Sequence, residues 1–271
     1  MTSPALASTG ANGHRVYTWA GREYPSVTAI ISGGVPKPFL ARWAAKAAAE
    51  YAIGNLDHLR LLPAGQAIRE VKQAPFTKRD VAADLGDLIH AAVEAHATGR
   101  PRPDLPEAAA GYLAGFDRFV AQRNPGFLLA ERTVYSRRYG YAGTFDLLAT
   151  VPGVGVVLLD VKTGNRVYPE VCLQLAAYAA GDFIGDPDGT TERPLPTIHA
   201  GAVLHLRPGG YHLLPIPISR AVLEAFLAAL AVFRFSTDLA PTLLPRADDE
   251  LPGHAREPVV PLTTQAARRT R

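Results

Sequence analysis

Residues 155–164, Gly-Val-Val-Leu-Leu-Asp-Val-Lys-Thr-Gly, constrain the fold more than any other stretch of the chain. Their unbroken apolar part is typical of a strand buried in the middle of a sheet. Because successive side chains of a strand point to opposite faces, Asp160 and Lys162 share one face and Val161 takes the other. An acid and a base at the end of a buried strand are costly to desolvate unless they are paired or used. We therefore expect a polar site at this end of the sheet.

A second acid, Asp146, lies in another strand-like run at residues 141–148. A Pro-Gly pair at residues 152–153 separates the two runs and is typical of a turn, so the runs are expected to form a hairpin. That pairing can bring Asp146 and Asp160 side by side. Two close carboxylates repel each other unless a proton or a cation lies between them. A divalent metal with oxygen ligands is the economical interpretation, and it leaves Lys162 free for chemistry.

Composition excludes several classes of protein. The 271 residues suit one large domain or two small ones, and 48% hydrophobic residues suffice for a sizeable core. The single cysteine, Cys172, excludes a disulfide framework and any cysteine-ligated zinc or iron–sulfur site within the chain, and it fits a cytoplasmic protein. No apolar run reaches the roughly 18 residues of a membrane span, so no membrane partner is expected. The net charge of +3 neither demands nor excludes a nucleic-acid partner.

The remaining pattern predicts an α/β protein in three parts. Residues 1–76 are expected to form a hairpin and a helical extension, residues 77–237 the core, and residues 238–271 a disordered tail. Within the first part, residues 1–13 are expected to be disordered, and Pro75 is expected to begin a loop. Helices are expected over residues 26–32, 39–51, 56–74 with an interruption near Pro63, 77–98, 107–123, 168–183 and 219–235. Besides the hairpin of acids, strands are expected over residues 14–19, 22–24, 127–136, 198–206 and 211–218, the last at a sheet edge.

The core order is helix, three strands, helix, strand. Three strands joined by short turns must be antiparallel neighbours, and the next helix can cross over to place the last strand parallel in the same sheet. With Asp146 followed by Asp160-Val161-Lys162, this order resembles the PD-(D/E)xK nuclease superfamily. Phe145 replaces the proline that precedes the first acid, a departure common in that group.

Two further motifs narrow the resemblance. Residues 174–178, Gln-Leu-Ala-Ala-Tyr, resemble the Q-x-x-x-Y signature of the RecB-like, phage-type exonuclease branch. Residues 86–90, Gly-Asp-Leu-Ile-His, resemble the upstream G-x-x-x-H motif of that branch, with His90 at the margin of an apolar helical stripe. The resemblance covers roughly residues 77–206. It implies a restriction-endonuclease-like core, a mixed sheet flanked by helices in the order αβββαβ, with an N-terminal helical extension.

The resemblance also implies roles for the site residues. His90, Asp146 and Asp160 would bind Mg²⁺ or Mn²⁺, with the carbonyl of Val161 as a further ligand. A nitrogen ligand makes Mn²⁺ more acceptable than it is in an all-oxygen site. Lys162 would orient or deprotonate the attacking water, or hold a phosphate oxygen.

Other residues have functional interpretations and, for three of them, an ordinary structural one as well. Gln174 and Tyr178 lie one turn apart on a helix and would contact the nucleic-acid backbone, brace the metal ligands, or simply pack against the sheet. Glu131 could bind a water of the metal or a second ion, or be an ordinary strand acid paired with Arg132 or Arg137. Two aromatic residues of the N-terminal helices are expected in a wall or arch over the site that favours single strands or duplex ends. These are Trp43 and Tyr51.

The leading hypothesis is a metal-dependent exonuclease acting on DNA in recombination, repair or phage DNA processing, with single strands or duplex ends as substrate. A recombinase or a single-strand-binding protein is a candidate protein partner. Two alternatives stay open: a structure-specific endonuclease, and a non-catalytic DNA-binding accessory protein that keeps the nuclease fold. The related CRISPR-associated nucleases carry four cysteines around an iron–sulfur cluster. Because Cys172 is alone, no such cluster is expected here.

Overall fold

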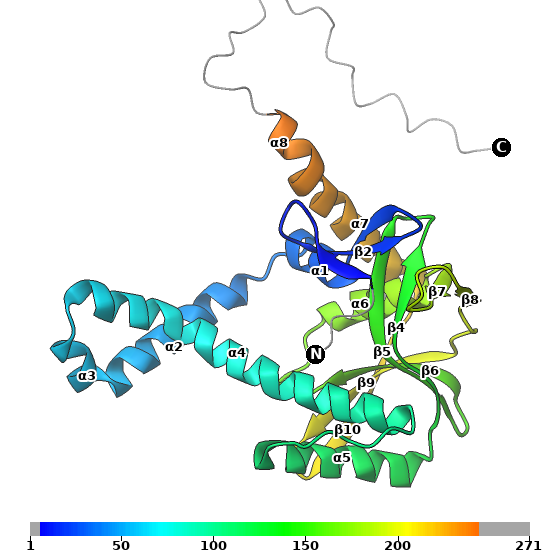
Figure 1. Ribbon diagram of the computed structural model, residues 1–271, viewed down its shortest axis with the longest axis horizontal. Helices are drawn as coiled ribbons and strands as arrows, with labels where there is room; N and C mark the ends of the chain where they lie inside the picture. The colour runs from blue at the N-terminus through cyan, green and yellow to red at the C-terminus, as the bar shows by residue number, and fades with distance from the viewer. Residues whose placement is uncertain (1–5, 244–271) are drawn as a thin grey trace, which may run out of the picture.

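The computed structural model describes residues 6–243, and a seven-stranded mixed sheet lies at its centre (Figure 1). The strands of this sheet are β4 (Gly126–Ser136), β5 (Tyr141–Val151), β6 (Gly155–Lys162), β7 (Phe183–Gly185), β8 (Glu192–Pro194), β9 (Ala200–Arg207) and β10 (Gly210–Ile216). Their spatial order is β10-β9-β6-β5-β4-β7-β8. The α/β class predicted from the sequence is confirmed at this level.

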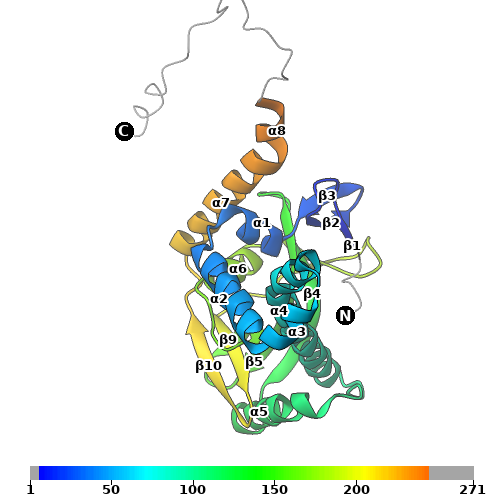
Figure 2. The same ribbon diagram turned by 90° about the vertical axis from the view of Figure 1, so that its left-hand side faces the viewer.

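Helices flank the sheet on both faces (Figure 2). The helices of the described residues are α1 (Val27–Gly34), α2 (Pro38–Gly54), α3 (Leu56–Leu61), α4 (Ala64–Ala97), α5 (Glu107–Arg123), α6 (Glu170–Ala179), α7 (Arg220–Arg234) and α8 (Ala240–Leu243), with a π-helical turn η1 (Phe235–Leu239) between the last two. α1, α6 and α7 pack on one face, where Leu148 and Leu158 are buried. α4 and α5 pack on the other face, where Leu147 and Leu159 are buried. Because both faces are covered, β6 can be apolar without alternation.

The pairings of the predicted strands are as expected, but two strands that the sequence did not predict, β7 and β8, follow α6. β4, β5 and β6 are antiparallel neighbours, and the predicted turn at residues 152–153 joins the last two. After α6 the chain first forms β7 and β8, which extend the sheet beyond β4, and only then returns to β9, which runs parallel to β6. β10 is the edge strand beside β9, as expected, and an edge tolerates Pro215 because one side of the strand needs no ladder hydrogen bonds.

A small N-terminal sheet packs against the main one. Its strands are β1 (Ala7–Thr9), β2 (Arg15–Trp19) and β3 (Arg22–Pro25), and its aromatic side chains lie against Tyr135 and Phe183. The prediction that residues 1–13 are disordered is therefore wrong for β1, which pairs with β2; residues 1–5 lie outside the described part.

An arm made of α2, α3 and the first half of α4 projects from the body (Figure 1). The loop predicted at Pro75 is wrong, because Pro75 lies buried inside α4, a continuous helix of 34 residues. An interior proline costs a helix about 3 kcal/mol. Contacts with α2 offset part of this cost: Tyr51 Oη donates to Glu70 Oε2 at 3.0 Å, and Lys78 Nζ lies 3.2 Å from Glu50 Oε2.

Two predicted boundaries near the C-terminal half also change. The helix expected over residues 168–183 is shorter, and Phe183 begins β7 instead. The disordered tail expected from residue 238 is wrong for residues 238–243, which are helical, and the rest of that tail lies outside the described residues. Among the helices of residues 6–243, none combines the length and apolar composition that crossing a bilayer requires.

Candidate functional site

The candidate site lies where β5 and β6 separate. The two strands pair as far as Leu147 opposite Leu159; beyond that point β5 continues along β4 and β6 along β9. The next residues in the same register are Asp146 and Asp160. The two acids therefore lie at the mouth of this fork, on neighbouring strands, as the hairpin predicted.

Hydrogen bonding at the fork orients Asp146. The backbone N–H of Val161, which has lost its ladder partner on β5, donates to Asp146 Oδ2 at 2.6 Å. The other oxygen, Oδ1, lies 3.6 Å from His90 Nδ1. One oxygen of Asp146 thus accepts the backbone hydrogen bond that β6 can no longer make with β5. The other oxygen faces α4, the helix that covers this side of the sheet.

Three side chains form a potential metal-binding group: His90 from α4, Glu131 from β4 and Asp146 from β5. One donor atom of each lies within 4.8 Å of the others, and His90 Nδ1 lies 3.9 Å from Glu131 Oε1. Atoms that share a small divalent ion at about 2.1 Å lie roughly 3–4 Å apart, so small side-chain movements suffice. Two carboxylates and an imidazole suit Mg²⁺ or Mn²⁺. His90 and Asp146 converge as predicted, and Glu131 joins them; Arg137, one of its expected partners, pairs with Glu192 instead.

The backbone of Glu131 is strained. Its φ of +47° lies in the left-handed region, which is unusual for a residue other than glycine inside a strand. The β4–β5 ladder skips this residue, pairing Ala130 with Leu147 and Arg132 with Phe145. Such a conformation costs about 1–3 kcal/mol and is concentrated at functional sites. No pattern in the sequence predicts this backbone conformation of Glu131.

Asp160 is the most buried acid at the fork, with 1% of its surface exposed. Lys162 Nζ forms an ion pair with its Oδ2 at 2.6 Å, yet neither oxygen has a well-directed hydrogen-bond donor among the described residues. Burial raises the pKa of Asp160 to about 6, against the opposing effect of Lys162. A buried carboxylate without donors fits a nearby cation. Asp160 lies outside the group of three donors, so direct ligation by Asp160 and by the Val161 carbonyl stay predictions.

Two basic side chains carry the positive charge of the site. Burial opposes protonation of His90, but the carboxylates of Asp146 and Glu131 outweigh it and raise the pKa to about 9. Burial likewise opposes the charge of Lys162, but the neighbouring acids, Asp160 first, hold its pKa above the ordinary value. The charges on these two residues offset two of the three acids, and a metal ion bound by His90 would have to displace the proton on its ring.

Residues of the Q-x-x-x-Y motif on α6 and of the G-x-x-x-H motif on α4 both take part in close packing around the fork. Gln174 Nε2 donates to Tyr178 Oη at 3.2 Å, and burial keeps the pKa of Tyr178 well above its ordinary value. The tyrosine ring lies so close to Gly143 on β5 that a Cβ there would sit 2.5 Å from Cε1. On the other side, a Cβ at Gly86 would sit 3.3 Å from Thr163 Oγ1. Both glycines therefore permit close approach at the fork.

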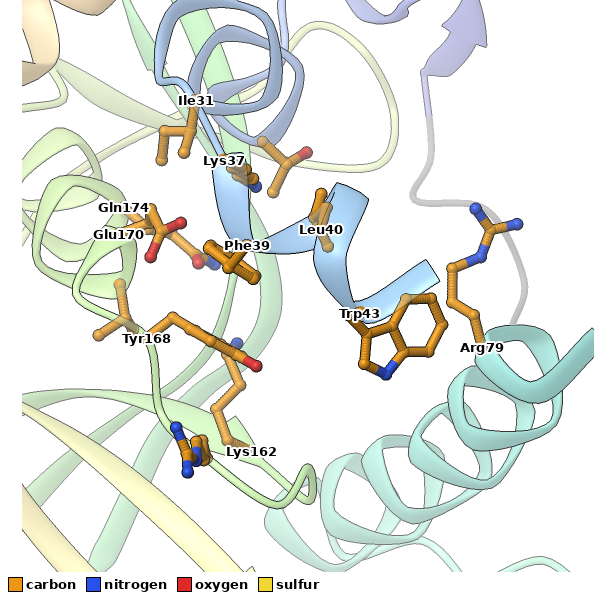
Figure 3. Close-up of a pocket in the computed structure, with 13 residues that line it drawn as sticks. Ile31, Lys37, Phe39, Leu40, Trp43, Arg79, Lys162, Tyr168, Glu170 and Gln174 are labelled. Atoms are coloured by element: carbon orange, nitrogen blue, oxygen red, sulfur yellow. The ribbon is translucent and has the colours of Figure 1, made fainter. Parts of the chain in front are cut away.

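A cleft of about 410 Å³ opens beside Lys162 (Figure 3). The start of α2, the segment before α6, and α6 itself provide most of its walls. Trp43 lines the cleft, as the expected arch requires. Tyr51 does not, because its hydroxyl is bonded to Glu70 within the arm, so that part of the prediction is wrong.

The arrangement combines a cluster able to hold a divalent cation, a lysine beside it, and a cleft that leads away from that lysine. Such a set can polarise and position a phosphate ester for attack by water. Comparison of the sequence with models of known protein families finds no match, and comparison with curated protein sequences finds none. The chemistry of the site is therefore the ground on which a function is assigned.

Proposed function

We propose that the chain is a metal-dependent nuclease that hydrolyses phosphodiester bonds in DNA, with a PD-(D/E)xK core of RecB-like type. The observation that carries the proposal is the convergence of His90, Glu131 and Asp146 beside the Asp160–Lys162 pair. These residues come from four separate elements, and an unrelated packing arrangement would have no reason to gather three acids in one place. The antiparallel β4-β5-β6 unit, the α6 crossover and the parallel β9 are compatible with the restriction-endonuclease-like fold.

Each residue has a role that follows from its geometry. His90, Glu131 and Asp146 would hold Mg²⁺ or Mn²⁺, which when bound lowers the pKa of water and offsets phosphate charge. Lys162 is assigned the role of donor to a phosphate oxygen, because it lies beside the cluster and neighbouring carboxylates, Asp160 first, hold its pKa above the ordinary value against the effect of burial. Asp160 orients Lys162 through their ion pair. Gln174 and Tyr178 position α6 against β5 at the fork.

Incubation of the protein with linear, closed circular and single-stranded DNA in Mn²⁺ tests the proposal. Lys162→Ala and Asp146→Ala should each lower the cleavage rate by at least about a hundredfold, since each removes a charge that acts on the transition state. Lys46→Ala is the matched control, because Lys46 is exposed on the arm. Cleavage that persists in both site variants would refute the assignment. Cutting of closed circles would identify an endonuclease, and cutting of linear DNA alone an exonuclease.

A further inference from the structure

The cleft beside Lys162 has a composition that the metal centre does not explain. Figure 3 shows aromatic and basic side chains converging from α2, α4 and the segment before α6. Lys162 and Gln174 line its inner end, so the cleft communicates with the proposed reaction centre. Whatever occupies the cleft therefore lies next to the bond that is cut.

Three exposed aromatic rings are gathered in this cleft. Phe39 at the start of α2 stacks on Tyr168, with ring centroids 4.9 Å apart and planes 7° apart. Trp43, one turn further along α2, faces the same space (Figure 3). The exposed fractions are 36% for Phe39, 38% for Trp43 and 48% for Tyr168. Exposed apolar faces gathered in a concave site indicate a ligand that covers them, and flat rings suit flat partners.

Positive charge surrounds these rings. Lys37, Arg79 and Arg166 line the cleft in addition to the lysine of the reaction centre, against one acid, Glu170. Arg79 is paired with its neighbour Asp80, whereas Lys37 and Arg166 make no ion pair with any carboxylate of residues 6–243. Unpaired cations beside exposed rings match a polymer of alternating phosphates and aromatic bases.

We propose that this cleft binds an unpaired DNA strand, with its bases stacked on Trp43 and on the Phe39–Tyr168 pair. Its phosphates would be bound by Lys37 and Arg166. The inference rests on the proposed nuclease function and deepens it, because it makes a single strand or a frayed end the substrate. Bases can stack on protein rings only where they have left the duplex. The stacked pair also joins α2 to the segment before α6, the two walls between which the strand would lie.

Tryptophan fluorescence provides the test, because the chain has two tryptophans and the other one, Trp19, is buried in the N-terminal aromatic cluster. The full chain is titrated in EDTA, where no cleavage occurs, with a thymidine oligonucleotide and with a blunt hairpin duplex of equal length. We expect the single strand to quench the fluorescence and the duplex to bind at least tenfold more weakly. The difference between wild type and Trp43→Phe isolates the signal of Trp43.

Variants assign the contacts. Phe39→Ala and Trp43→Ala should each weaken single-strand binding at least about fivefold, the lower end of a lost stacking contact. Phe235→Ala, which removes an exposed ring from η1, should bind as wild type does. Thermal melts identify any variant that fails to fold, and Lys37→Gln then tests the cleft without touching the rings.

Equal affinity for strand and duplex, or unchanged binding in both ring variants, would overturn the inference. Tighter binding of a uridine oligonucleotide than of the thymidine one would overturn the assignment to DNA. Because these measurements need no metal, they are independent of catalysis: single-strand binding without Mn²⁺-dependent cleavage would refute the nuclease and leave the cleft assignment standing.

Discussion

Replacing Glu131 by glycine should make the metal-free protein more stable and should weaken its stabilisation by metal. The residue has a φ of +47°, which glycine adopts without strain and glutamate does not. Relief of that strain should raise the free energy of unfolding of the metal-free protein by about 1 kcal/mol. In a chain of this size that corresponds to a rise in melting temperature of about 2–4 °C.

In the presence of Mn²⁺, wild type should have a higher free energy of unfolding than the glycine variant. At a Mn²⁺ concentration 100 times its dissociation constant, wild type gains about 2.7 kcal/mol. If loss of one of three ligands weakens binding a hundredfold, the glycine variant gains only about 0.4 kcal/mol at the same concentration. The difference of about 2.3 kcal/mol exceeds the strain relief, so wild type becomes the more stable protein.

Denaturant unfolding in EDTA and in Mn²⁺ measures both effects. Glu131→Gln is the control, because it keeps the strained backbone and removes only the charge, so it should lose the response to Mn²⁺ without the gain in EDTA. A glycine variant less stable than wild type in EDTA would refute the strain. Equal stabilisation of both proteins by Mn²⁺ would exclude Glu131 as a ligand.

Three other predictions follow from the same geometry. Because its pKa is raised to about 9, His90 is protonated at neutral pH, so Mn²⁺ binding should release about one proton. The Mn²⁺ affinity should therefore rise roughly tenfold per pH unit until about pH 9. Calorimetry in buffers of different ionisation enthalpy measures the proton release, and His90→Asn should abolish it. Lys162→Ala should stop hydrolysis but leave Mn²⁺ affinity within about tenfold, as the same calorimetry will show. Gly143→Ala should cost about 1–3 kcal/mol of unfolding free energy because its Cβ meets the ring of Tyr178, whereas Gly54→Ala, with nothing within 4 Å, should be nearly neutral.

Much of the fold could be predicted because it depends on local rules. The Pro-Gly turn at residues 152–153 implied antiparallel neighbours, and antiparallel register then placed Asp146 opposite Asp160. The apolar run of β6 implied cover on both faces, which helices supply. Helix α5 was predicted with its observed bounds, since its start and end signals are local.

Long-range packing decided what could not be predicted. The rule that proline ends a helix failed at Pro75, where the helix continues and contacts between α2 and α4 offset part of the cost of the lost hydrogen bond. Tyr51 was expected near the site because it is aromatic, but the acceptor that fixes its position, Glu70, comes from another helix of the arm. The three-residue β7 has too little sequence to show a period and forms only because β4 offers it a partner.

The strained, buried and clustered side chains of the site have a common origin in the fork between β5 and β6. Where the strands separate, the backbone N–H of Val161 loses its ladder partner and takes Asp146 instead, while the facing ladder skips the strained Glu131. The separation also leaves Asp160 buried, with the Lys162 ammonium as its one close cationic partner among residues 6–243, and places the carboxylates of Asp146 and Glu131 where they raise the pKa of His90 to about 9. A divalent cation would compensate the clustered acids at once, and no other single group would, because protons satisfy them only one at a time. The costs retained in the metal-free fold are thus those that the proposed cation would offset, so the strain and burial at this fork support the proposed metal site over imperfect packing.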